Sequence, residues 1–134
     1  MKSLLAIVFA LLMPVAALAA DASADATAAA KAWLALVDQG NYAQSWADSS
    51  KLMQTSISQD AWAQAAKPIH ETLGAVVSRD PAGVDLMKSL PGAPDGEYAV
   101  VHFHTKFEKK SAATETVTMM MDGGKWKSAG YFIK

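Results

Sequence analysis

The apolar positions in the first part of the chain recur with the period of a helix. Between about residues 27 and 39 they fall three or four residues apart, at Ala29, Trp33, Leu36 and Val37. This spacing places them on one side of a helix with 3.6 residues per turn. The pattern predicts an amphipathic helix. Gly40 is expected to end it, because glycine readily adopts the left-handed conformation that follows many helices.

A second helix is predicted directly after this glycine. Asn41 can cap its first turn, and Gln44 stands three residues later, which is the spacing of a capping box. The apolar side of this helix is expected to carry Tyr42, Trp46 and Met53.

A third helix is expected to start near Ser58. Ile57 before the cap and Trp62 at the fourth helical position form a hydrophobic staple. Pro68 lies inside the helix and is expected to kink it, because the proline ring clashes with the preceding turn. Gly74 marks the end.

The second half of the chain has the period of strands. Segments 75–80, 97–107, 115–122 and 125–133 are strand-like and are separated by turn residues. Asp122-Gly123-Gly124 predicts a tight hairpin, because glycine supplies the positive φ that two-residue turns need. The segment 91–96, Pro-Gly-Ala-Pro-Asp-Gly, predicts a rigid turn.

The strongest alternation lies in segment 97–107. One face is expected to carry Ala99, Val101, Phe103, Thr105 and Phe107, and the other Tyr98, Val100, His102, His104 and Lys106. Helices followed by strands predict an α+β fold, with three N-terminal helices packed on a four-stranded antiparallel meander. One face of such a sheet is left for solvent, a ligand or a partner.

The first 19 residues have the three parts of a cleavable signal peptide. Lys2 precedes an uncharged run from Leu4 to Leu18, and Ala17-Leu18-Ala19 supplies the small residues of a cleavage site. The run is shorter than the roughly 20 apolar residues of a membrane span, and Pro14 interrupts it; an uncleaved anchor is the alternative. We therefore expect a periplasmic or secreted protein, with residues 20–134 as a single domain and 20–26 disordered.

The composition of the chain limits the chemistry and the binding partners that we expect. The chain has 134 residues, of which 51% are hydrophobic and 19% charged, and it contains no cysteine. Packing must therefore replace disulfides, and thiol chemistry is excluded. Cleavage removes Lys2 and takes the formal net charge from −1 to −2, which predicts binding neither to nucleic acid nor to a membrane surface.

Motifs along the whole mature chain resemble the bacterial domain of unknown function 4019 family. They include Trp33-Leu34-x-Leu36-Val37-Asp38-x-Gly40-x-Tyr42, the run from Leu90 to Tyr98, Glu115-Thr116-Val117, Gly124-x-Trp126 and Gly130-Tyr131-Phe132-Ile133. The resemblance implies a small exported domain with a nuclear transport factor 2-like or cystatin-like fold, and it implies no activity. One motif departs from the family: His70-Glu71-Thr72-Leu73-Gly74 stands where the family usually has Arg-x-Pro-Leu-Gly.

Two groups of side chains are candidate metal ligands, a pair of histidines and a run of three methionines. His102 and His104 stand two residues apart on one strand, so both rings point to the same side, and neutral imidazole is a common metal ligand. A site needs further ligands, and His70 is the only other histidine. Met119-Met120-Met121 suits copper, although methionine is also a common core residue.

Arg79 is the only arginine. Together with Tyr98, His102 and His104 it is the predicted ligand-binding set, in which the guanidinium would clamp an anion. The alternative is a structural ion pair with Asp38, Glu97 or Glu115.

No catalytic motif is present, and we name no catalytic residue, metal ligand or cofactor. A base such as Asp38, Asp48 or His102 would need a pocket that shifts its pKa; isomerase chemistry on the related fold is an analogy of fold alone. The aromatic residues are expected in the core: Trp33, Trp46, Trp62, Trp126, Tyr42 and Tyr131.

The leading hypothesis is a non-enzymatic exported domain that binds a small molecule or a protein partner through the free sheet face or a helix–sheet cavity. The alternatives are a periplasmic isomerase or hydrolase with a helix–sheet pocket, metal binding through His102 and His104, and a homodimer built on the sheet face.

Overall fold

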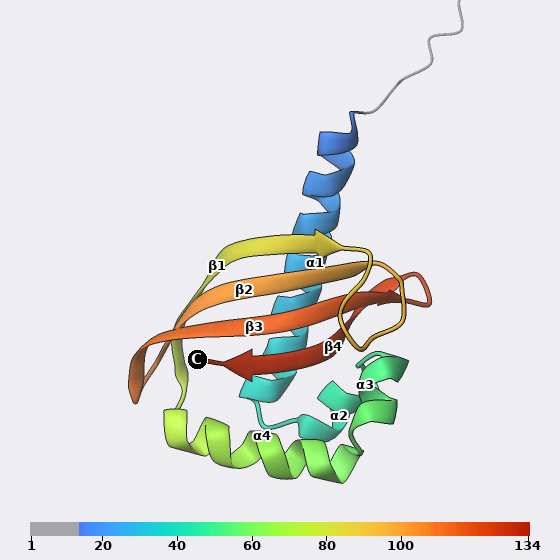
Figure 1. The fold of residues 1–134 in the computed structure, drawn as a ribbon. Coiled ribbons are helices and arrows are strands. Elements are labelled where there is room, and N and C mark those ends of the chain that lie inside the picture. The colour runs from blue at the N-terminus through green and yellow to red at the C-terminus, as the bar shows by residue number, and fades with distance from the viewer. Residues whose placement is uncertain (1–13) are drawn as a thin grey trace, which may run out of the picture.

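The computed structural model describes residues 14–134, and the chain forms an α+β fold in the order predicted (Figure 1). Helices are followed by a four-stranded antiparallel sheet whose strands lie in sequence order. The elements are α1 (Val15–Asp38), α2 (Tyr42–Ala47), α3 (Lys51–Ser56), α4 (Gln59–Leu73), β1 (Val76–Met87), β2 (Tyr98–Phe107), β3 (Lys110–Asp122) and β4 (Lys125–Ile133).

The predicted alternation in β2 is confirmed on its apolar face. Ala99, Val101 and Phe103 are fully buried, and Thr105 and Phe107 are nearly so. We call the sheet face that carries them the inner face, and the opposite one the outer face. Helix α1 runs along the inner face (Figure 1), so one face of the sheet is covered by a helix, as an antiparallel sheet allows.

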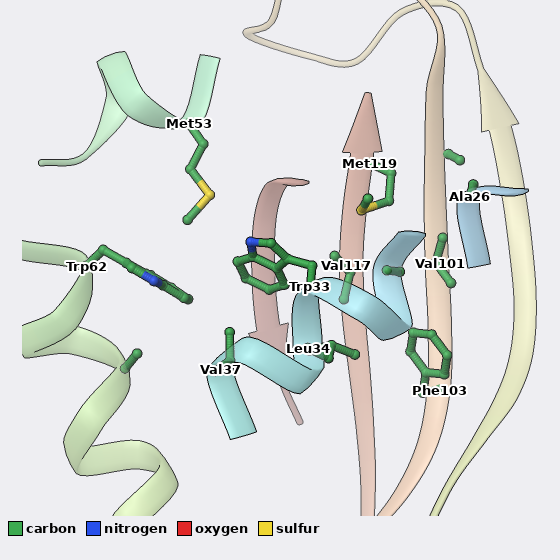
Figure 2. Close-up of a cluster of buried hydrophobic side chains, with 13 residues drawn as sticks. Ala26, Trp33, Leu34, Val37, Met53, Trp62, Val101, Phe103, Val117 and Met119 are labelled. Carbon is green, nitrogen blue, oxygen red and sulfur yellow. The ribbon is translucent and has the colours of Figure 1, made fainter. Parts of the chain in front are cut away.

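The core lies between α1, α4 and the inner face. Figure 2 shows the Trp33 ring between Trp62 and the strands, with Leu34 and Val37 on the same helix. The rings of Trp33 and Trp62 have centroids 5.5 Å apart. The remaining aromatic residues of the predicted core are partly buried against this cluster: Tyr42, Trp46, Trp126 and Tyr131.

Helix α1 starts earlier than predicted. Residues 20–26 were expected to be disordered, and this is wrong, because they lie inside α1. This part of α1 has no pattern of large apolar residues, because its buried positions are the small residues Ala26 and Ala30. Alanine is also the residue that favours helix most. Of the predicted signal peptide, residues 1–13 lie outside the described part of the chain and the remainder opens α1. No described helix is long and apolar enough to cross a membrane.

The second predicted helix is two helices, so the count of three is corrected to four. Asn41 caps α2 as expected, but Gln44 bonds to Asp48 at 2.8 Å and does not reach back to Asn41. The helix then breaks because the Ser50 N–H donates to the carbonyl of Ser128 in β4, 2.9 Å away. The Ser50 hydroxyl accepts from the Met53 N–H and begins α3.

Helix α4 matches its prediction closely. Ser58 caps it through the Ala61 N–H, and Gly74 ends it with a φ of 77°, a value that favours glycine. The helix continues through Pro68 to Leu73. The hairpin at Asp122 is also confirmed, since Gly123 and Gly124 have φ values of 61° and 80°.

Strands β1 and β3 are longer than predicted. Strand β1 continues from Asp80 through Pro81 to Met87, with irregularities in its register on both sides of Arg79. Proline lacks an N–H and is tolerated on an edge strand, which is the position of β1. Sequence patterns that treat proline as a strand end therefore miss this half of the element.

Candidate functional site

The four residues predicted to bind a ligand do not come together. Arg79 pairs in register with Thr105 and shares the inner face with it. Tyr98, His102 and His104 belong to the outer face. The sheet itself thus separates the arginine from the other three.

On the inner face Arg79 binds two carboxylates. Its Nη1 and Nη2 donate to the two oxygens of Asp38 at 2.7 and 3.0 Å. Its Nε and Nη2 donate to the two oxygens of Glu115 at 2.7 and 3.2 Å. These bonds are the structural ion pair considered as the alternative to an anion clamp, with Asp38 and Glu115 as its carboxylates and without Glu97.

Glu115 is the centre of this group, which we call the Arg79 cluster (Arg79, Asp38, Glu115, Thr105 and Tyr131). Its side chain is fully buried. Besides Arg79, the hydroxyls of Thr105 and Tyr131 donate to its two oxygens, each at 2.5 Å. Each of the two carboxylate oxygens of Glu115 therefore accepts two hydrogen bonds. A buried carboxylate needs such bonds to replace those it makes with water.

The cluster shifts the pKa values of its own members. Burial raises the pKa of the Tyr131 hydroxyl well above its usual range, and the nearby Glu115 carboxylate adds to the rise. Burial alone would lower the pKa of Arg79, but the bonds to Asp38 and Glu115 outweigh it and the net shift is upward. Both groups therefore keep their protons throughout the physiological pH range.

The outer-face residues are held by other partners. Tyr98 is buried beneath the β1–β2 loop and donates its hydroxyl to the carbonyl of Pro94 at 2.6 Å. The two ring nitrogens of His102 lie 3.1 Å from the Thr116 hydroxyl and 3.2 Å from Asp85. His104 is exposed. Residues 14–134 contain no group of three histidine, aspartate or glutamate side chains that could hold a metal ion.

A groove lies between α4 and β4, and we call it the α4–β4 groove. It has a volume of about 580 Å³. Two apolar side chains stand half exposed at it, Ile69 on α4 and Phe132 on β4, with exposed fractions of 49% and 53%. The described residues that line it are Ile57, Trp62, Ala65, Ala66, Ile69, His70, Leu73, Lys110, Tyr131, Phe132, Ile133 and Lys134.

His70 links the groove to the Arg79 cluster. Its ring stacks on Tyr131 with centroids 6.2 Å apart, and its Nε2 is buried without a hydrogen-bond partner among the described residues. Burial lowers the pKa of His70, although the charges of Asp38 and Glu115 act in the opposite direction. At neutral pH the His70 ring is therefore uncharged, and it lies between the groove and the buried carboxylates.

The groove was not found from the sequence. His70 had a signal, because the resemblance described above implies an arginine at its position. In the structure the charges of Asp38 and Glu115 act on its ring. Ile69 and Phe132 had none, because their exposure depends on how α4 and β4 lie relative to each other.

The free energy of unfolding is expected to fall as the pH drops below 6.5, the usual pKa of histidine. The unfolded chain takes up a proton at His70 that the buried ring resists, so stability rises with pH in this range. In urea unfolding at pH 5 and 7.5, His70→Gln should weaken the pH dependence. The exposed His104→Gln is the matched control. An unchanged pH dependence in His70→Gln would contradict the assignment.

Comparison with known proteins supports the resemblance seen in the sequence. The family model described as Protein of unknown function (DUF4019) matches residues 29–131, a range that begins within α1, ends at Tyr131 in β4 and includes every member of the Arg79 cluster. No curated protein matches the chain. The chain belongs to the family of proteins of unknown function called DUF4019.

Proposed function

We propose that the protein is an exported, non-enzymatic domain that binds a ligand with an apolar body in the α4–β4 groove. The observation that carries the proposal is the pair Ile69 and Phe132, which stand half exposed on opposite walls of the groove. Ligand sites are typically concave and mostly apolar, with a few polar groups. Exposed apolar side chains gathered at one hollow mark such sites.

The polar groups of the groove indicate the charge of the ligand. Lys110 and Lys134 are among its lining residues, and the described lining includes no carboxylate side chain. A ligand that combines an apolar body with a negative group would therefore match the groove in both shape and charge.

Binding without chemistry is favoured over the isomerase or hydrolase alternative. Glu115, whose carboxylate bonds to the groove residue Tyr131, is fully buried and also accepts bonds from Arg79 and Thr105. A general base must reach the proton that it removes, and Glu115 is closed off by Tyr131. Metal binding through His102 and His104 is disfavoured for a similar reason, since Asp85 and Thr116 occupy both nitrogens of His102.

Export rests on the signal peptide predicted for residues 1–19, with the mature domain in the periplasm or secreted. Cleavage after Ala19 would cut α1 in its first turns. The side chains lost there are exposed, with Val15 82% and Leu18 55% exposed, whereas the buried positions of α1 begin at Ala26. The mature domain would thus keep its core, in a fold that we propose to be nuclear transport factor 2-like or cystatin-like.

The test uses the mature chain recovered from the periplasmic fraction, for which mass spectrometry should show Ala20 at the N-terminus. The probe is anilinonaphthalene sulfonate, an anion with apolar rings. It should bind saturably, and Ile69→Asp should weaken binding by about tenfold or more, which is 1.4 kcal/mol, because it places a negative charge in the groove.

The matched control is Val77→Asp. Val77 is also exposed, at 58%, but it lies on β1 and is not part of the groove lining. Equal loss of binding in both variants, or no saturable binding by the parent domain, would refute the groove as the ligand site. Recovery of an uncut chain would refute the proposed export.

A further inference from the structure

We infer that the α4–β4 groove takes an extended peptide segment of another protein, which adds to the sheet as a fifth strand beside β4. The inference rests on the proposed function and names the chemical class of its ligand. It is carried by the backbone of β4, by the difference between the two sheet edges, and by the lining of the groove.

The outer edge of β4 carries unpaired backbone groups. Strand β4 is the last of the sheet, and no described strand pairs with its other side. Lys134 and Thr114 exchange both of their backbone hydrogen bonds, at 2.9 and 3.1 Å. In an antiparallel ladder such pairs alternate with pairs whose N–H and C=O groups point away from each other. In the last part of β4, Tyr131 and Ile133 are therefore the residues that direct these groups outward, toward a next strand.

The two edges of the sheet differ in their protection. The β1 edge contains Pro81, register irregularities on both sides of Arg79, and the charged residues Asp80 and Asp85, which are the usual devices against strand addition. Strand β4 has lysines only near its start, at Lys125 and Lys127. After Ser128, whose carbonyl accepts from the Ser50 N–H, the strand contains neither charge nor proline as far as Ile133. Tyr131, Phe132 and Ile133, at the end of this stretch, line the groove.

The groove has the form of a site for a single strand. Its walls are the β4 edge on one side and α4 on the other. In Figure 1, α4 lies below β4, on the side of the strand away from β3. Peptides that add to a sheet edge take affinity from main-chain hydrogen bonds and specificity from pockets for alternate side chains. Tyr131 and Ile133 would supply the main-chain bonds, and Ile69 would contact the side chains that point toward α4. A helix beyond the edge leaves room for one segment more readily than for a second sheet.

The charge of the groove selects among peptides. Lys110 and Lys134 line it and no carboxylate side chain of the described residues does. The segment that fits has apolar residues at alternate positions, which face α4, and an acidic residue near an end, which faces the lysines.

The experiment uses the mature domain labelled with nitrogen-15 and a set of blocked heptapeptides. In these peptides valine alternates with threonine, and zero, one or two aspartates stand at the ends. Hydrogen exchange at the Tyr131 and Ile133 amides should slow by about tenfold or more on binding. The Gly130 and Phe132 amides, which the alternation directs toward β3, are the internal control and should change little. Peptides with aspartate should bind more tightly than those without.

Methylated peptides separate strand addition from simple burial. Methylation of one set of alternate peptide nitrogens should abolish binding, because it removes the donors that face β4, whereas methylation of the other set should be tolerated. Equal binding of both methylated forms, or no protection of Tyr131 and Ile133, would overturn the inference. So would the absence of binding below about 1 mM, which corresponds to −4.1 kcal/mol.

Two further outcomes separate this inference from the proposed function. If anilinonaphthalene sulfonate binds in the Ile69-dependent way and no peptide does, the proposed function stands and strand addition is refuted. If light scattering of the free domain gives twice the monomer mass and the Tyr131 and Ile133 amides are protected without peptide, a second copy occupies β4, and the peptide inference is also refuted.

Discussion

Replacing Arg79 by methionine is expected to lower the free energy of unfolding by about 3–5 kcal/mol, the cost of leaving one member of a buried ion pair without its partner. Glu115 is fully buried and would keep only the hydroxyls of Thr105 and Tyr131. Asp38 is partly exposed, with 26% of its side chain accessible, so water can replace the arginine there. The loss should therefore arise mainly at Glu115.

A double-mutant cycle checks this assignment. Glu115→Gln alone also leaves a buried partner incompletely satisfied, but Arg79→Met combined with Glu115→Gln removes both charges. The double variant should therefore lose less than the sum of the two single losses. Urea unfolding followed by circular dichroism provides the measurement. Strictly additive losses would show that the Arg79–Glu115 pair is not the source of the effect.

The second large effect is expected at Trp33, whose replacement by alanine should cost about 3–5 kcal/mol, as for other buried large aromatic residues. The indole is 4% exposed and packs against Trp62 and Tyr131 with ring centroids 5.5 and 5.7 Å away. Its Nε1 donates to the carbonyl of Ser45 at 2.8 Å. Alanine would leave a cavity between α1 and α4, and the Ser45 carbonyl would lose one of its two donors and keep only the Ser49 hydroxyl, 2.7 Å away.

Two controls separate packing from hydrogen bonding. Trp33→Phe keeps most of the ring and removes the donor, so it should cost less than alanine. Trp126→Ala removes a tryptophan that is only partly buried and should cost less than Trp33→Ala. Thermal or urea unfolding of the four proteins gives the comparison. An equal loss in Trp33→Ala and Trp126→Ala would contradict the central role of Trp33.

Elements with local signals could be predicted from the sequence. Helix α4 has its cap at Ser58 and its stop at Gly74 within the segment itself, and the β3–β4 hairpin has its two glycines at the turn. The alternation of β2 likewise placed its apolar side chains on the inner face. In each case the residues that decide the structure are neighbours along the chain, so propensity and periodicity were sufficient.

Features that depend on distant partners could not be predicted in this way. The break between α2 and α3 follows from a bond between Ser50 and Ser128, and no helical pattern contains that information. Asp38, Glu97 and Glu115 were the partners predicted for Arg79 from the sequence. The selection among them depends on the strand register and on the packing of α1, which carries Asp38, against the sheet. The register also separates Arg79 from Tyr98 on opposite faces of the sheet.

The unequal protection of the two sheet edges also sets a limit on self-association. An open-ended filament needs a heterologous contact, here β4 of one molecule against β1 of the next, repeated without closure. Pro81 and the register irregularities of β1 interrupt the surface that such a contact would need. Two β4 edges can meet only around a twofold axis, and in that contact the β4 edges of both molecules are paired, so that neither is left for a third copy. If this domain associates through its sheet at all, growth should therefore stop at two copies, even at the high local concentrations under which unprotected β-edges elsewhere produce fibres.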